Sequence, residues 1–199
     1  TPGALVSLLP RALGLLEQQQ PMLALNVLER SGRELLAMLR AGDIELARRM
    51  ARHGLDAAEL TGAPWALVHA NAVGALCWQD APEGADMLAR AVTASSGHGA
   101  IDAWTRIDRL IAPQLLSAAM VRGIGPREAV VAMTAACGGE VVAAMTQILA
   151  DAPAPARVML AEAVAEATVD AEVVDALLRD REQTVRDAAR AAWARRREG

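Results

Sequence analysis

Histidine and cysteine are the side chains from which a chain of this kind would most readily build a catalytic or metal site. The three histidines, His53, His69 and His98, lie in separate segments, and no Gly-x-Ser-x-Gly turn presents a serine nucleophile beside them. Neither His-Glu-x-x-His nor Cys-x-x-Cys occurs, so the short ligand spacings of a zinc site are missing. We therefore expect no nucleophilic catalysis and no bound metal.

The two cysteines, Cys77 and Cys137, stand 60 residues apart in apolar helical surroundings. This setting predicts buried free thiols in a reducing compartment, and we expect a cytoplasmic protein. A disulfide between the two cysteines is the alternative.

Glycines and carboxylates supply the remaining chemical possibilities. Gly-x-Gly occurs only at 97–99 and 123–125, where it neither follows a predicted strand nor brings the lysine of a phosphate-binding loop. A row of carboxylates suits the exposed faces of repeat helices better than general acid–base catalysis; it comprises Glu162, Glu166, Asp170 and Asp175. The sequence thus predicts a protein that is not an enzyme, with no catalytic residue and no cofactor.

The charge balance bears on possible partners. The formal net charge is −4, which disfavours nucleic acid and anionic membranes because neutralising phosphates requires a basic face. A local basic stripe runs from 179 to 197, interleaved with acidic residues. It is typical of a solvated final helix, and contact with nucleic acid or with an adjoining domain is the alternative.

Helices are the elements that must position these residues. More than half of the chain, 53%, is hydrophobic, dominated by the helix formers Ala and Leu, with four Trp and no Phe or Tyr. Prolines suited to first turns and glycines suited to helix ends divide the chain into short segments. The expected helices are 3–19, 21–40, 43–60, 64–79, 82–95, 100–121, 126–137, 139–150, 154–167, 170–179 and 182–197. Their short connections predict an all-α, right-handed α-solenoid of antiparallel helix pairs, with about 10–11 helices.

Two kinds of internal repeat support this architecture. The segment 39–47, Leu-Arg-Ala-Gly-Asp-Ile-Glu-Leu-Ala, resembles the middle of a tetratricopeptide repeat. Residues 71–92 resemble a second copy, in which the segment 71–76 supplies a small-residue notch on the first helix. The resemblance implies that the small residues Ala47 and Gly54 let one helix nest against its neighbour. A plain antiparallel bundle is the alternative.

The last third carries a different repeat. Asp151 with Arg157, and Asp180 with Arg186, both follow the pattern Asp-x5-Arg, and the two copies stand 29 residues apart. This pattern resembles the HEAT-type helical repeat. The resemblance implies an inter-repeat ladder between turn aspartates and second-helix arginines, and a core face formed by Val185, Ala189 and Trp193. Coincidental helix caps are the alternative.

The expected organisation is tetratricopeptide-like hairpins at 1–98, a long bridging helix at 99–125 with a kink at Pro113, and HEAT-like hairpins at 126–199. No low-complexity linker separates them, which favours one continuous domain. A start at Thr1-Pro2 without a secretory signal indicates a fragment of a larger protein.

A candidate interaction surface follows from the large and charged side chains. Trp65 and His69 lie one turn apart on one helix face and would line a concave groove, while arginines occupy the polar side of the preceding helix. The full set is Trp65, His69, Asn71, Arg48, Arg52 and Trp104. For each tryptophan taken singly, Trp65, Trp78 and Trp104, packing in the core is the favoured interpretation, because a core without Phe or Tyr needs other large residues.

The Arg- and Ala-rich texture of these repeats resembles the C-terminal helical regions of large actinobacterial LuxR-type and antibiotic-regulatory transcriptional activators. That resemblance implies a non-catalytic protein-interaction or ligand-sensing scaffold within a regulatory or signalling protein. Its partner would be another protein or an adjoining domain of the same chain. A self-association module forming a homo-oligomer is the alternative, and a HEAT-like nucleic-acid-binding enzyme is a remote one.

Overall fold

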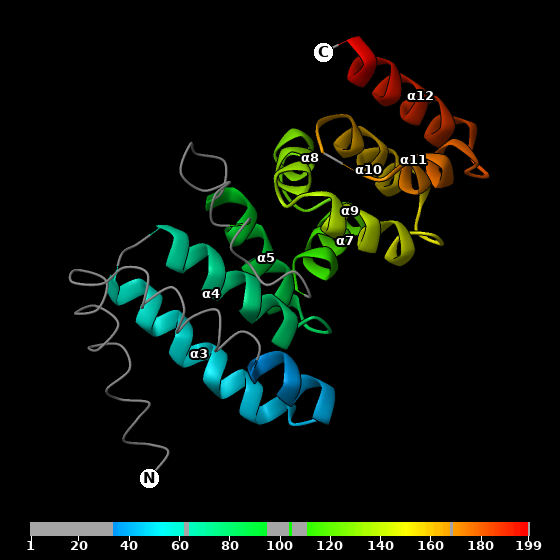
Figure 1. The fold of residues 1–199 in the computed structure, drawn as a ribbon. Coiled ribbons are helices and arrows are strands. Elements are labelled where there is room, and N and C mark those ends of the chain that lie inside the picture. The colour runs from blue at the N-terminus through cyan, green and yellow to red at the C-terminus, as the bar shows by residue number, and fades with distance from the viewer. Residues whose placement is uncertain (1–33, 62–63, 95–103, 105–110, 168, 199) are drawn as a thin grey trace. The chain divides into compact units, whose positions relative to one another are not determined.

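A computed structural model describes residues 34–61, 64–94, 104, 111–167 and 169–198 (Figure 1). Every regular element within these ranges is an α-helix, which confirms the all-α class. The chain divides into two compact units, Thr1–Asp108 and Arg109–Gly199. The right-handed solenoid stays a prediction, and the helices expected before residue 34 lie outside the described residues.

In the first unit, residues 34–41 are helical and are followed by α3 (Ile44–Thr61), α4 (Pro64–Cys77) and α5 (Pro82–Ala94). The second unit contains α7 (Ala112–Arg122), α8 (Arg127–Ala136), α9 (Gly139–Ile148), α10 (Ala154–Glu166), α11 (Ala171–Leu178) and α12 (Gln183–Glu198). The bounds expected from residue 43 onward agree with these within two residues, apart from the bridging helix.

The bridging helix differs from the expectation in its described part. Ile111 is the N-cap of α7 and Pro113 lies in its first turn, so a helix begins here. Residues 105–110 lie outside the described residues, and the kink expected at Pro113 stays a prediction. A proline in a first turn costs no hydrogen bond and therefore starts a helix as readily as it bends one. At the other end Gly123 adopts φ 64°, and its N–H bonds to the carbonyl of Ala119. The contacts of α7 with α8, α9 and α10 lie within the second unit.

The first unit is built around α4, which contacts α3 on one side and α5 on the other (Figure 1). The residues of this helix from Ala66 to Cys77 are buried except Leu67, and so is Trp78 directly after it. A Cβ placed on Gly84 would lie 2.1 Å from the carbonyl oxygen of Trp78, so glycine is required where α5 begins beside the end of α4. A Cβ on Gly74 would lie 2.8 Å from the Sδ of Met87.

The nesting expected at Ala47 and Gly54 stays a prediction. Ala47 is fully buried. A Cβ on Gly54 would meet no described atom within 4 Å, so the structure shows no close approach of helices there.

The second unit consists of the pairs α7–α8, α9–α10 and α11–α12, in which helices at the same place in each pair contact one another. Thus α7 contacts α9 and α9 contacts α11, while α8 contacts α10 and α10 contacts α12. Arg127 at the start of α8 donates hydrogen bonds of 3.1 and 2.7 Å to Glu162 on α10. The same order of helices therefore repeats within this unit.

The core face of α12 differs from the expectation at one position. Val185 and Ala189 are buried, but the side chain of Trp193 is 38% exposed, and Ala192 is buried in its place. Successive helical residues turn by about 100°, so Trp193 lies about 80° around the helix from Val185. Placing Trp193 in the core was wrong because a spacing of eight residues leaves the buried stripe.

Candidate functional site

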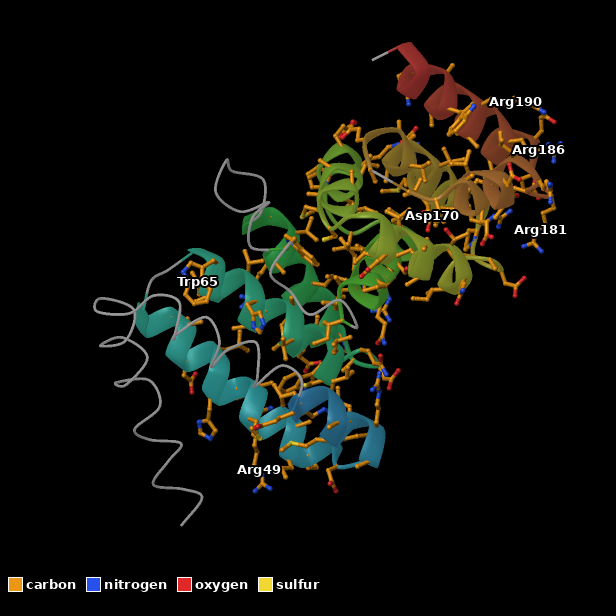
Figure 2. All side chains as sticks on the ribbon, in the orientation of Figure 1. Arg49, Trp65, Asp170, Arg181, Arg186 and Arg190 are labelled. Atoms are coloured by element: carbon orange, nitrogen blue, oxygen red, sulfur yellow. The ribbon has the colours of Figure 1, made fainter. Side chains whose placement is uncertain are left out.

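The six residues of the expected interaction surface have different environments. His69, Asn71 and Trp104 are only 4%, 8% and 0% exposed, so they present no open surface. Trp65 is half-buried near the start of α4 (Figure 2). The groove expected from Trp65 to Asn71 is therefore wrong, because α3 and α5 cover both sides of α4. Asn71 instead bonds to its own helix, donating from Nδ2 to the carbonyl of Leu67 at 2.8 Å.

The two remaining residues, Arg48 and Arg52, meet at Trp78. The Cζ atoms of Arg48 and Arg52 lie 5.7 and 5.4 Å from the centre of the Trp78 ring, within the range of cation–π attraction. Trp78 itself is only 5% exposed. We call this group, Arg48, Arg52 and Trp78, the Arg–Trp cluster.

Local structure positions each member of the Arg–Trp cluster. Arg48 and Arg52 stand one turn apart on α3 and so project from neighbouring places on one face. Trp78 follows directly after α4 ends. The Nε of Arg48 donates a hydrogen bond of 3.0 Å to the carbonyl of Cys77, one of the last carbonyls of α4. Such carbonyls lack a partner within their helix, and a cation beside them is favourable.

The charge around the Arg–Trp cluster is only partly balanced. Glu45 lies 3.4 Å from Nη1 of Arg48, but its side chain is 84% exposed. Within the described residues Arg52 has no ion-pair partner, and neither has Arg49 on the exposed side of α3 (Figure 2). This part of α3 can therefore accept an anionic group from outside, such as a carboxylate.

The sequence favours a surface position for Arg48 and Arg52 and a core position for Trp78, but it does not indicate that the three meet. No local pattern could do so, because the cluster joins two helices through residues 26 to 30 apart in the chain. The pairing depends on how α3 lies against α4. The one local indication is the end of an apolar helix near Cys77, where the last carbonyls lack partners and a nearby cation is favourable.

The second unit contains a buried ion pair. Arg157 donates from Nε to Oδ2 of Asp180 at 2.8 Å and from Nη2 to Oδ1 at 3.0 Å. Arg157 also donates to the carbonyl of Ala152, and Asp180 accepts from the amide of Glu182. This is the contact that the HEAT resemblance implied for these two residues. Membership of that class stays a prediction.

The environment of Asp180 alters its acidity. Burial alone would raise the pKa of this carboxyl, but hydrogen bonds from Arg157 and the Glu182 amide, with the charges of Arg157 and Arg181, outweigh burial and leave the pKa lowered. The hydrogen bond to Asp180 likewise raises the pKa of Arg157, although burial opposes it. A cavity of about 280 Å³ adjoins the pair, lined largely by apolar side chains such as Leu149, Leu160 and Leu177. Because the charges of Arg157 and Asp180 neutralise each other, this pair presents no unpaired charge to a ligand in the cavity.

Both cysteines are free thiols; Cys77 is buried and Cys137 is half-buried. Burial raises the pKa of Cys77 to about 11, although the charge of Arg48 opposes the shift. Burial also raises the pKa of Cys137 to about 12. Since the thiolate is the nucleophilic form, neither cysteine is activated at neutral pH.

Comparison of the chain with protein-family models, curated proteins and solved structures gave no match. In the part of the chain that the structure describes, no three His, Cys, Asp or Glu side chains gather as a metal site would require. No helix in the described ranges is long and apolar enough to span a membrane.

Proposed function

We propose that this chain is a non-catalytic α-solenoid scaffold that binds an acidic segment of a protein partner at the Arg–Trp cluster. The observation that carries the proposal is the pair of guanidinium groups held 5.7 and 5.4 Å from one buried indole ring. Within the described residues, Glu45 is the one carboxylate that pairs with them.

The cluster has hydrogen-bond donors to spare. Arg48 uses Nε for the carbonyl of Cys77 and one N–H of Nη1 for Glu45. Arg52 donates no hydrogen bond within the described residues. A guanidinium carries five N–H donors in a planar fork that fits a carboxylate, so each arginine can receive an acidic side chain.

The cluster is also pre-organised. Contact with the indole restricts Arg48 and Arg52 before a partner arrives, and the Cys77 carbonyl further fixes Arg48. Because ordering a long side chain costs conformational entropy, arginines that are already held lose less on binding than free ones. A partner with two carboxylates about one helical turn apart would match the spacing of Arg48 and Arg52.

The wider role that we propose is a module of a larger regulatory or signalling protein, such as a transcriptional activator. The resemblance of the repeats to such proteins supports this role. The partner would be another protein or an adjoining domain of the same polypeptide. The repeated helix contacts in Arg109–Gly199 support a solenoid, since stacked repeats present extended binding surfaces.

A direct test is the binding of a fluorescein-labelled helical peptide with glutamates one turn apart, followed by fluorescence anisotropy. We expect the double variant Arg48→Gln/Arg52→Gln to weaken binding by about tenfold or more, because two charge-assisted contacts are lost. We also expect added salt to weaken binding to the wild-type chain.

The matched control is Arg90→Gln, at an exposed arginine of α5 in the same unit. It removes one positive charge, as each substitution of the double variant does. It should leave the affinity within about twofold of wild type. A glutamine version of the peptide should not bind. Equal affinity of the wild-type chain and the double variant would overturn the proposal. A self-association module and a nucleic-acid-binding enzyme both stay predictions. No contact among the described residues favours either of them.

A further inference from the structure

Helices α10 and α12 repeat one local arrangement. Nη1 of Arg157 donates to the carbonyl of Ala152, and Nη1 of Arg186 donates to the carbonyl of Arg181 at 2.9 Å. In both helices the acceptor lies five residues before the arginine, and the two arginines stand 29 residues apart. Arg186 is therefore the structural equivalent of Arg157.

The face of α10 that carries Arg157 is covered. Helix α12 packs on α10, and Asp180, in the turn before α12, reaches back to Arg157. Val164, seven residues after Arg157 and so on the same side of α10, is only 3% exposed. The Arg157–Asp180 contact thus joins neighbouring helix pairs, and a buried apolar residue lies two turns farther along the same side of α10.

Among the described helices α12 packs on α10 and α11, and its equivalent face is partly exposed. Trp193 stands where Val164 does and is 38% exposed. Arg190 lies between them, with a side chain 59% exposed and an ion pair of 2.9 Å to Asp187 on its own helix. Figure 2 shows Arg186 and Arg190 along the same edge of α12. We call Arg186, Arg190 and Trp193 the α12 face.

Arg186 also lacks the carboxylate that its equivalent has. Its guanidinium donates to the carbonyl of Asp180 at 2.5 Å and to Oε1 of Gln183 at 2.5 Å, besides the Arg181 carbonyl. No ion pair joins Arg186 to any described residue. All observed acceptors of Arg186 are neutral groups. Arg157 makes the equivalent hydrogen bond to a carbonyl and in addition pairs with the carboxylate of Asp180.

We propose that the α12 face docks a further helical hairpin, whose interhelical turn places an aspartate against Arg186 as Asp180 is placed against Arg157. The second helix of that hairpin covers Trp193 with small apolar residues, at the position where the equivalent residue of α10, Val164, is buried. This surface lies in Arg109–Gly199, and the proposal does not depend on binding at the Arg–Trp cluster.

A second copy of the chain is a poor occupant in this register. Its Asp151 is the equivalent of Asp180, has a fully exposed side chain, and lies 3.9 Å from its own Arg181. For Asp151 of a second copy to reach Arg186 in this register, helices α9 and α10 of that copy would have to pack where a further hairpin would. Within that copy, α7 and α8 already pack on the face of α9 and α10 that this would use. The Asp180 of a second copy is already paired with its own Arg157. The occupant is therefore a hairpin with an aspartate of its own.

The test supplies such a hairpin covalently. Residues 167–199 are duplicated directly after Arg195, which corresponds to Glu166 at the 29-residue spacing. The appended copy carries Glu172→Asp, so that peptides containing position 172 differ in mass between the two hairpins. Hydrogen exchange followed by mass spectrometry of these peptides reports the protection of each hairpin, and protection of 111–166 confirms that the rest is folded.

We expect the appended hairpin to be protected from exchange. Arg186→Met in the native hairpin and Asp180→Asn in the appended copy should each reduce the protection of the appended hairpin by about tenfold. Both changes together should reduce it little further, because they remove the same contact. Arg179→Met, at an exposed arginine, should change it by less than about twofold. Exchange of the appended hairpin at unfolded rates, or additive losses from the two changes, would overturn the proposal.

Discussion

Arg157 and Asp180 are joined by two parallel hydrogen bonds, 2.8 and 3.0 Å long, and their side chains are only 4% and 11% exposed. The pair ties α10 to the turn before α12. Removing one partner leaves the other charge buried and unpaired. We therefore predict that Arg157→Met or Asp180→Asn lowers the free energy of unfolding by about 3–5 kcal/mol, measured by denaturant unfolding.

The control for this prediction is Arg127→Met. The side chains of Arg127 and Glu162 are 43% and 33% exposed, so solvent can replace that partner. We expect a loss below about 1 kcal/mol. The apolar double variant Arg157→Met/Asp180→Leu should be close to wild type, because it leaves no buried charge. Equal losses for Arg157→Met and Arg127→Met would contradict the account.

The lowered pKa of Asp180 predicts a pH dependence. Above the ordinary value of 3.8 the carboxylate is charged in both states and the full stabilisation is present. As the pH falls, the unfolded chain binds the proton first, so stability is lost until the folded carboxyl is also protonated. Unfolding titrations between about pH 6 and pH 3 should show a steeper loss for wild type than for Arg157→Met/Asp180→Leu. Parallel curves would rule out this role.

Gly74 on α4 and Gly84 on α5 should differ in how well they tolerate an added methyl group. A Cβ on Gly84 would lie 2.1 Å from a backbone oxygen, whereas a Cβ on Gly74 would lie 2.8 Å from the Sδ of Met87. Because backbone yields less readily than a methionine, Gly84→Ala should cost about 2–3 kcal/mol. Gly74→Ala should stay within about 1 kcal/mol, since alanine favours the helix.

Gly54→Ala is the matched control for both substitutions. Its Cβ would meet no described atom within 4 Å, so we expect stabilisation of about 0.5–1 kcal/mol from helix propensity alone. Thermal and denaturant unfolding of the three variants should rank Gly54→Ala above Gly74→Ala above Gly84→Ala. A Gly84→Ala variant as stable as wild type would show that α4 and α5 do not approach as described.

Much of this fold could be predicted because its signals are local. Prolines suited to first turns, such as Pro82, and glycines that close helices, such as Gly123, mark most helix bounds. The Arg157–Asp180 contact could be anticipated because the same pattern occurs twice at a fixed spacing.

The remaining features depend on tertiary packing. His69 and Asn71 are buried because α4 has neighbours on two sides, which no helical periodicity reveals for a helix that is apolar all round. Trp193 is exposed because the buried stripe of α12 passes through Ala192 instead. The Arg–Trp cluster joins residues of different helices, and its assembly needs the packing angle between them.

The thiols should react slowly in the folded chain. Their pKa values of about 11 and about 12 keep both protonated at neutral pH. We predict that Ellman's reagent modifies the native protein at pH 8 at least about 100-fold more slowly than the denatured protein, since the thiolate fraction falls tenfold per pKa unit. Stability should also fall as the pH rises above 9, because the unfolded thiols ionise first. Equal rates in both states would contradict burial.

Binding of an acidic partner at the Arg–Trp cluster can be observed by a nuclear magnetic resonance titration of the full chain with the glutamate peptide, following the side-chain N–H signals of arginine and tryptophan. We expect saturable shifts of the Arg48 and Arg52 Nε–H and the Trp78 indole N–H, with the Arg90 signal unmoved. Unchanged Arg48, Arg52 and Trp78 signals at saturating peptide, or equal shifts at every exposed arginine, would contradict binding at the cluster.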